Sequence, residues 1–243
     1  MAVPRADPRQ WRRHWVPWDW TDMVLFVVLL MISFVAVSAP IVAGAGTAAP
    51  LLHLSRQTAQ EVVNQAAVDL PAVAIVGVLV FGRRHATRAQ LGWCRPRWWW
   101  LVLAIPLALF CEGISIPLQN LNEHLAPGHV NGQCQAVKHG YGAAYALAIP
   151  MICGIVPFAE ETVFRGFLFG WLRRWLPLWL SAPLAALAFA AVHATLAILL
   201  PLFAVGLVLV LIYQWSGSLY PGMLVHGTFN LVGVITILSA SSC

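Results

Sequence analysis

The chain has 243 residues, of which 60% are hydrophobic and only 9% are charged, whereas about 25% of residues in an ordinary soluble domain are charged. A soluble domain could not bury so much apolar surface, and runs of roughly 20 apolar residues, the length that crosses a hydrocarbon core, recur along the chain. The composition therefore excludes a soluble globular protein. The net charge of +5 does not indicate a nucleic-acid partner, because the positive residues cluster at the ends of the apolar runs.

The chain begins with a segment, 1–21, in which arginines alternate with tryptophans. Such a composition is typical of an interfacial segment at a membrane surface. Apolar runs then predict spans at about 22–43, 66–82, 98–118, 141–171, 178–195, 199–215 and 218–239. We expect an all-α polytopic transmembrane helical bundle of about seven spans, within a range of six to eight, around a polar intramembrane cavity. Residues 22–243 would form one transmembrane domain, with a catalytic core at about 141–239.

The positive residues predict the orientation of the chain. Eleven of the 14 Lys and Arg residues fall in 1–21, 83–97 and 173–174, and all 12 tryptophans lie in or beside the cytoplasmic segments that this pattern predicts, Trp215 at the end of the span 199–215. By the positive-inside rule these segments are cytoplasmic, so the N-terminus is expected inside. The polar stretch 56–65 and the loop 119–140 would lie on the far side, and Asp69 is interpreted as a helix start. The Trp- and Ala-rich composition indicates a bacterial source, hence a multi-pass protein of the bacterial plasma membrane.

Three polar interruptions stand out within the last spans. Glu160, Glu161 and Arg165 interrupt the fourth span, Phe189 and His193 lie in the fifth, and His226 and Asn230 lie in the seventh. Ionisable groups at membrane depth cost about 2.5–3.5 kcal/mol each, so they usually face a cavity and serve a function. Each interruption contains a pair at i, i+4, the spacing that places two side chains on one helix face.

The three interruptions lie at similar depth. With a rise of 1.5 Å per residue, Glu160, His193 and His226 are roughly 20, 18 and 15 Å from the cytoplasmic ends of their spans. This coincidence predicts one shared site. Glu161 could pair with Arg165 and leave Glu160 free, although adjacent helical residues diverge by about 100°, so only packing decides which glutamate is the base.

These residue types suit the activation of water. A carboxylate in an apolar cavity binds its proton more tightly, and a nearby arginine opposes this effect, so the outcome can be a general base that works near neutrality. His193 could hold the water with Glu160, and His226 with Asn230 could donate hydrogen bonds to an oxyanion. No serine or cysteine has an evident base beside it, and the zinc motif HExxH is absent.

Two further residues are assigned to the surroundings of the site. Phe189 is interpreted chiefly as core packing that lines the substrate cavity. Glu112, a separate carboxylate in the third span, is interpreted as the partner of an arginine or as polar lining of the same cavity.

At the three motifs, Glu160-Glu161-x-x-x-Arg165, Phe189-x-x-x-His193 and His226-x-x-x-Asn230, the chain resembles the CPBP family. This is the CAAX-protease and bacteriocin-processing group of intramembrane endopeptidases, also called type II CAAX prenyl endopeptidase-like or Abi proteins. The resemblance covers about 150–235 and implies a helical membrane core with a conical cavity that cleaves peptide bonds without an acyl-enzyme.

The resemblance also implies roles for the motif residues. Glu160 would be the general base, His193 its partner in holding water, and His226 with Asn230 the oxyanion donors. Glu161 and Arg165 would shape the site. Metalloendopeptidase activity is the alternative: Glu160, His193 and His226 could offer a His₂Glu set of zinc ligands, but we favour a site without metal.

Three functions remain open from the sequence. The favoured one is an intramembrane endopeptidase acting on a protein or peptide, membrane-associated or lipidated, in contact with membrane lipid. The second is a non-catalytic membrane binding or immunity protein on the same scaffold. The third is a small-solute transporter that uses the buried Glu and His residues as a proton relay. The intact motifs favour the first, because a binding protein has no need for a base, an arginine and oxyanion donors together.

Overall fold

The computed structural model describes residues 16–49, 54–129, 131–141 and 144–239, and the regular elements within them are all helices. Six helices are long and apolar enough to cross a membrane: Trp20–Thr47, Arg56–Arg83, Trp98–Leu125, Ala146–Trp175, Leu196–Ser216 and Leu219–Ser239. The predicted fifth span is a shorter apolar helix, Leu178–Val192. The expectation of an all-α polytopic bundle is confirmed, and the protein is a multi-pass membrane protein.

Several spans combine α-helical segments with π-helical segments, which carry η labels, and η8 is a 3₁₀ turn. The first five labelled elements are α1 (Trp20–Ser33), η2 (Phe34–Ser38), α2 (Ala39–Ala48), α3 (Arg56–Gly77) and η4 (Val78–Arg83). Next come α4 (Arg88–Leu91), α5 (Trp98–Leu125), α6 (Gly132–Gln135) and η5 (Ala136–Gly140). The remaining elements are α7 (Tyr145–Pro150), η6 (Met151–Ile155), α8 (Val156–Glu160), η7 (Glu161–Phe169), α9 (Gly170–Trp175), α10 (Leu178–Val192), η8 (Leu196–Ile198), α11 (Leu199–Ser216) and α12 (Leu219–Ser239).

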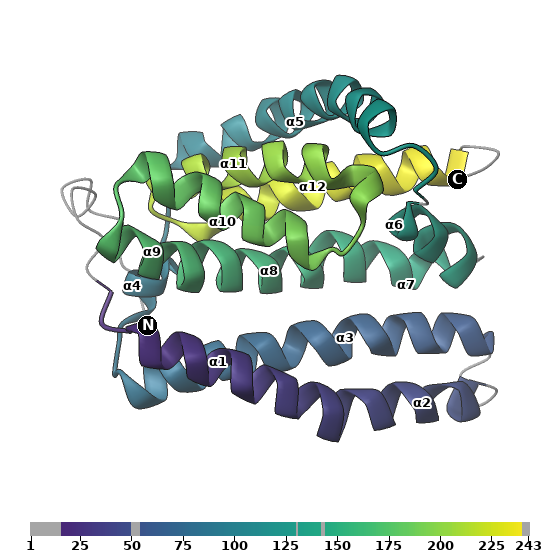
Figure 1. Ribbon diagram of the computed structural model, residues 1–243, viewed down its shortest axis with the longest axis horizontal. Coiled ribbons are helices and arrows are strands. Elements are labelled where there is room, and N and C mark those ends of the chain that lie inside the picture. Colours follow the sequence, from purple (N-terminus) through teal and green to yellow (C-terminus); the bar gives the residue numbers. More distant parts are fainter. Residues whose placement is uncertain (1–15, 50–53, 130, 142–143, 240–243) are drawn as a thin grey trace.

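The helices form three groups side by side (Figure 1). The first span and α3 run antiparallel as a hairpin along one side, and α5 lies on the opposite side. Between them lie the span that carries the double glutamate, from α7 to α9, and the helices α10, α11 and α12. Of the two spans in the hairpin, α3 is the one that packs directly against α8 and η7 of the central group.

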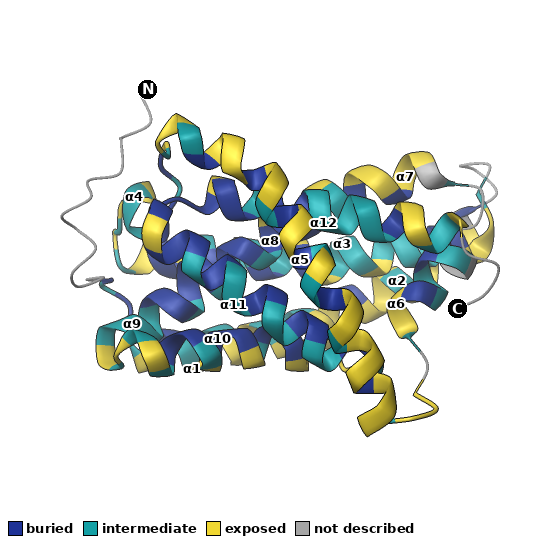
Figure 2. Cartoon of the chain, turned by 90° about the horizontal axis from the view of Figure 1, so that it is seen from above, coloured by how far each residue is buried: buried dark blue, intermediate teal, exposed yellow. Residues whose placement is uncertain are grey.

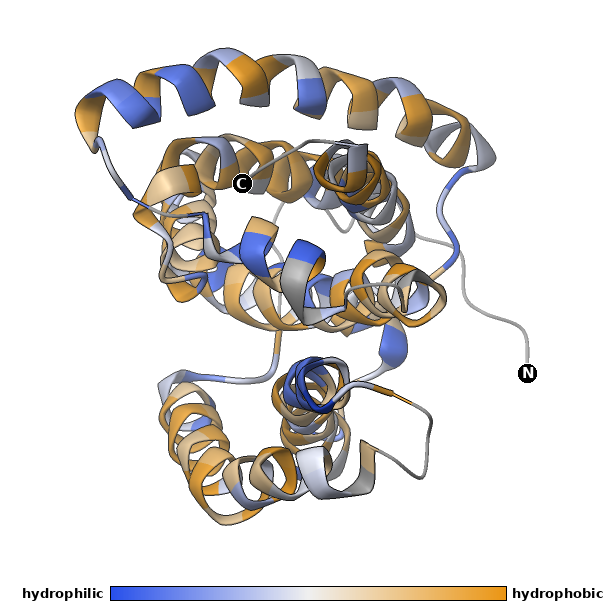
Figure 3. Cartoon of the chain, turned by 90° about the vertical axis from the view of Figure 1, so that its right-hand side faces the viewer, coloured by the Kyte–Doolittle hydropathy of each residue, from blue (hydrophilic) through white to orange (hydrophobic). Residues whose placement is uncertain are grey.

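The outward surfaces of the bundle are apolar. Large hydrophobic side chains are exposed along α1 and α5, for example Met31, Ile105 and Phe110. Buried residues instead concentrate on the inward faces of the central helices, as Figure 2 shows, and hydrophobic residues cover much of the helix surfaces in Figure 3. Because lipid replaces water around a transmembrane helix, this exposed apolar surface is the expected lipid-facing surface.

The glutamate-bearing span is not a regular α-helix. It contains two π-helical segments, η6 and the nine-residue η7, and Pro150 and Pro157 lie within or at the start of its α-helical segments. A proline cannot donate a backbone hydrogen bond, so the i→i−4 ladder is interrupted at each one. π-Helical turns are rare and occur often at functional sites. Here the longer π segment begins at Glu161.

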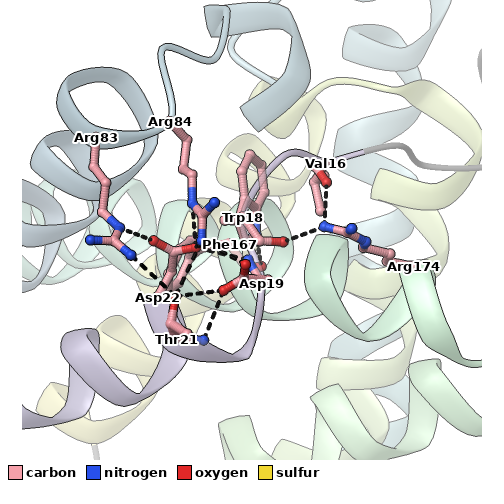
Figure 4. Close-up of polar contacts among 9 residues, drawn as sticks. All are labelled: Val16, Trp18, Asp19, Thr21, Asp22, Arg83, Arg84, Phe167 and Arg174. Carbon is pink, nitrogen blue, oxygen red and sulfur yellow. Dashed lines mark hydrogen bonds and ion pairs between the residues drawn. The ribbon is translucent and has the colours of Figure 1, made fainter.

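The N-terminal segment is anchored on the glutamate-bearing span. Trp18 is fully buried, its indole N–H donates to the carbonyl oxygen of Phe167 at 3.0 Å, and its ring stacks on the Phe167 ring. Arg174 donates to the carbonyl oxygens of Val16 and Trp18, as drawn in Figure 4. Trp18 therefore packs inside the protein rather than at the membrane interface. Residues 1–15 of the predicted interfacial segment lie outside the described residues.

Charged side chains join the start of α1 to the end of η4 (Figure 4). Asp19 caps α1, and Asp22 receives hydrogen bonds from Arg83 and Arg84 at 3.0 and 2.7 Å. The Thr21 hydroxyl, which donates to the Asp19 carboxylate, and the nearby Arg84 lower the pKa of Asp19 to about 2. This cluster therefore links the start of the hairpin at α1 to its finish at η4.

Two sequence-based boundaries were wrong. The second span begins at Arg56, capped by Ser55, rather than at 66, so Asp69 is a buried residue inside α3 and not a helix start. The segment 119–140 is largely helical, because α5 continues to Leu125 and α6 with η5 follow. In both places the helix continues through polar residues, several of which are exposed, so a low hydropathy did not mark a loop.

Candidate active site

The structure brings the three predicted polar interruptions together. Glu160 is the last residue of α8, His193 follows the end of α10, and His226 lies in α12. The His193 Nε2 atom lies 3.8 Å from Glu160 Oε1, and the His226 Nε2 atom lies 3.5 Å from Glu160 Oε2. One carboxylate thus faces two imidazole rings from two other helices.

The second glutamate has a different environment. Glu161 lies 2.9 Å from Arg165, and both side chains are fully buried. The Arg165 guanidinium also lies 4.3 Å from the centre of the Phe189 ring and donates to the Gly206 carbonyl oxygen. A buried charge at this depth requires such a partner, because the uncompensated charge would cost several kcal/mol.

The exposure of the two glutamates separates them. The Glu160 side chain is 15% exposed, whereas the Glu161 side chain is 0% exposed and is held by Arg165 and by His226. The π-helical segment that begins at Glu161 places these adjacent residues in different surroundings. Only Glu160 is open to a molecule that enters the site.

Hydrogen-bond partners determine how each imidazole is used. His193 Nδ1 lies 2.7 Å from the Phe189 carbonyl oxygen, which can only accept, so Nδ1 carries the proton. The Nε2 atom of the neutral ring, which faces Glu160, is then free to accept a hydrogen bond from a third group. His226 Nδ1 lies 3.2 Å from Glu161 Oε1. That oxygen is paired with Arg165 and accepts, so His226 Nδ1 is also a donor.

Phe189 packs beneath these rings. Its side chain is 1% exposed and makes edge contacts with His193 and His226 at centroid distances of 4.9 and 5.7 Å. Together with the Arg165 guanidinium on its face, the ring fills the space between the three polar motifs. Phe189 therefore packs against the imidazole rings of both His193 and His226.

Asn230 lies one turn beyond His226 on α12. Its side-chain amide donates to the carbonyl oxygen of Ile152 in η6 at 2.8 Å. This bond uses one of the two amide hydrogens and orients the side chain between α12 and the glutamate-bearing span. The second amide hydrogen is left for another acceptor.

Glu112 lies on a different helix from these residues, α5. It is half-buried, and its Oε1 atom has no hydrogen-bond partner among the described residues. Among the described residues, no arginine forms an ion pair with Glu112.

Two further residues adjoin the site and were not identified as site residues from the sequence. Asp69 on α3 is buried, accepts a hydrogen bond from Gln65 at 2.7 Å, and lies within electrostatic reach of Glu160 and His193. Gly222 lies one turn before His226, and a Cβ atom there would come within 2.8 Å of Glu161 Oε2. The signals were an ionisable residue at membrane depth and a glycine at i−4 from a motif histidine.

The sequence left a His₂Glu zinc site at Glu160, His193 and His226 as an alternative. Among the described residues, no group of three or more His, Cys, Asp or Glu side chains is arranged to hold a metal ion, and this includes Glu160, His193 and His226. The Arg165 guanidinium, one layer below, already neutralises Glu161.

The fold and the site define a multi-pass membrane protein with a glutamate–histidine centre buried among its last helices. Residues 142–232 match the family described as Type II CAAX prenyl endopeptidase Rce1-like, and all three motifs fall inside this match. The match assigns this region to the CPBP, or CAAX protease, family and confirms the resemblance carried by the motifs. No curated protein and no solved structure matches the chain.

Proposed function

We propose that this protein is an intramembrane endopeptidase that hydrolyses a peptide bond with water activated by Glu160 and His193. The family match suggests a CAAX-type intramembrane protease. The observation that carries the proposal is the meeting of one accessible carboxylate with two oriented imidazoles, above a buried Glu161–Arg165 pair. A protein that only binds a partner does not require this combination.

Catalysis begins with a water molecule between Glu160 and His193. The water donates one hydrogen bond to the Glu160 carboxylate and the other to the His193 Nε2 atom, both of which accept in the geometry described above. Glu160 takes a proton as the water oxygen attacks the carbonyl carbon of the substrate. A positioned general base of this kind contributes about 10²–10⁴ in rate.

The tetrahedral intermediate then needs donors for its oxyanion. The second amide hydrogen of Asn230 is one, and His226 Nε2 is the other when the ring is protonated at both nitrogens, with Glu161 holding the Nδ1 proton. Loss of one such donor costs about 10²–10³ in kcat. The proton on Glu160 passes to the leaving nitrogen as the carbon–nitrogen bond breaks, which restores the carboxylate and releases a carboxylic acid and an amine.

We propose a protein or peptide substrate, membrane-associated or lipidated, because the site lies at membrane depth among helices with apolar outer surfaces. No nucleic-acid partner and no metal are proposed. We further propose a bacterial plasma-membrane protein with a cytoplasmic N-terminus. This orientation is supported by the arginines that gather at the end of the bundle where α1 begins and α9 ends.

The test is cleavage by the purified protein in nanodiscs. Wild type, Glu160→Gln and Glu161→Gln would be incubated with a pool of membrane-protein and prenylated peptides, with and without a strong zinc chelator, and read by mass spectrometry. Glu160→Gln is expected to lower the rate by about 10²–10⁴ without lowering thermal stability. Glu161→Gln is expected to lower both, because it weakens the buried pair with Arg165.

Three outcomes would contradict parts of the proposal. A Glu160→Gln protein that cleaves at the wild-type rate would remove Glu160 as the base. Cleavage that is lost with chelator and restored by added zinc would convert the assignment to a metalloendopeptidase. In-cell function that survives both Glu160→Gln and His193→Ala would favour the non-catalytic binding protein.

A further inference from the structure

The connection that follows His193 is short and irregular. The helix α10 ends at Val192, Ala194 adopts a left-handed conformation with φ +49°, and the 3₁₀ turn η8 leads into α11. The Thr195 hydroxyl donates to the His193 carbonyl oxygen at 2.9 Å. The backbone after His193 thus leaves the helix within one residue, and its peptide groups need partners from elsewhere.

One side chain from a distant part of the chain supplies these partners. Asn122, in the last turn of α5, is 4% exposed. Its amide nitrogen donates to the carbonyl oxygen of Leu196, and its amide oxygen accepts from the Leu200 N–H at 3.1 Å. Leu200 lies in the first turn of α11, where backbone N–H groups have no partner within the helix.

An asparagine is suited to this position because it has both a donor and an acceptor on one planar group. An aspartate would keep the acceptor for Leu200 and lose the donor for Leu196, and an alanine would lose both. Because Asn122 is only 4% exposed, water cannot easily replace these bonds. Asn122 is therefore the structural clamp of the connection 194–198.

We propose that Asn122 is a positioning residue of the active site, which holds His193 against Glu160 by fixing the connection that follows it. This inference rests on the proposed function for its catalytic consequence. Asn122 lies outside the segment 142–232 that matches the family, so nothing in that match assigns it a role.

The position of His193 can be measured without any substrate. Diethyl pyrocarbonate modifies imidazole nitrogens that carry a free electron pair, and the rate at each histidine can be followed by mass spectrometry. His193 Nε2 is such a nitrogen, and its side chain is only 12% exposed. In Asn122→Ala the released connection is expected to raise the His193 rate several-fold, with a smaller rise in Asn122→Asp.

Controls are present in the same chain. Asn120→Ala changes an exposed asparagine on the same helix and is expected to leave the His193 rate at the wild-type value. The exposed His85, which follows the end of η4, serves as an internal reference, and its modification rate is expected to be the same in every variant. Asn122→Asp, which keeps one of the two clamp bonds, provides the measurement if Asn122→Ala does not fold.

The catalytic consequence is tested separately. If Asn122 acts through His193, Asn122→Ala lowers kcat by about 10- to 100-fold with KM unchanged, because a displacement of about 1 Å at the chemistry has an effect of this size. An unchanged His193 modification rate in folded Asn122→Ala and Asn122→Asp would overturn the inference. Because that readout needs no cleavage, it remains decisive even if the peptidase proposal fails.

Discussion

The two halves of the bundle use charged residues in opposite ways. In the α1–α3 hairpin, the ion pairs Arg83–Asp22 and Arg84–Asp19 lie at the helix ends, with one or both side chains partly exposed. In the matched segment 142–232, the Glu161–Arg165 pair lies in the middle of a span and is fully buried. The first arrangement joins helices at their partly exposed ends, whereas the second holds two opposite charges that are fully buried in the middle of a span.

The comparison explains the different costs of the two arrangements. Partly exposed ion pairs are worth about 0–1 kcal/mol, so the hairpin could lose one with little effect. Breaking a buried pair leaves an uncompensated charge and costs about 3–5 kcal/mol. Here the pair also contacts His226, through Glu161.

The largest expected effect comes from Arg165→Met. It leaves Glu161 buried without its partner, so the free energy of unfolding should fall by about 3–5 kcal/mol. Arg83→Met, which removes one side of a pair that is 47% exposed, is the matched control, with an expected loss of about 0–1 kcal/mol. Unfolding in detergent, followed by circular dichroism, measures both. Equal losses would contradict the distinction between the two regions, and the double variant Glu161→Gln/Arg165→Met should recover part of the loss.

A smaller effect is expected from Gly222→Ala. The added Cβ would lie 2.8 Å from Glu161 Oε2, so the carboxylate must move and its bond to His226 weakens. Overpacking of this kind costs about 1–3 kcal/mol, and the cleavage rate should fall with it. Gly233→Ala on the same helix has nothing within 4 Å of the added atom and is the control. Activity retained in Gly222→Ala would show that the Glu161–His226 contact is dispensable.

The smallest effect is expected from Asp19→Asn, because asparagine caps a helix as well as aspartate does. The pKa of Asp19 lies at about 2, below its ordinary value of 3.8. A lowered pKa adds stability that is fully present above about pH 4 and is lost as the pH falls through about 2. The free energy of unfolding of the wild type should therefore exceed that of the variant by about 0–1 kcal/mol at neutral pH. This difference in unfolding free energy should vanish near pH 2. A difference independent of pH would contradict the lowered pKa of Asp19.

Much of the site was predictable because its residues follow helical spacing. The pairs 161/165, 189/193 and 226/230 are each four residues apart, and their similar depth predicted that they meet. What could not be predicted lies in the first half of the chain. Asp69 and Asn122 reach the site region by packing between helices that are distant in sequence, and neither belongs to a spaced motif. The helix at 56–65 was missed for another reason, because its polar residues lower its hydropathy without ending the helix.

The order of residues by itself determined the membrane class, the approximate spans and the depth of the polar groups. These follow from hydrophobicity summed over about 20 residues and from the constant rise of the helix. Only the tertiary structure decided which glutamate is accessible, which nitrogen of each imidazole faces it, and which residues of the first half support it. Adjacent side chains on a helix diverge by about 100°, so their surroundings depend on the neighbouring helices. Those neighbours are set by packing, which places Arg165 beside Glu161 and leaves Glu160 open.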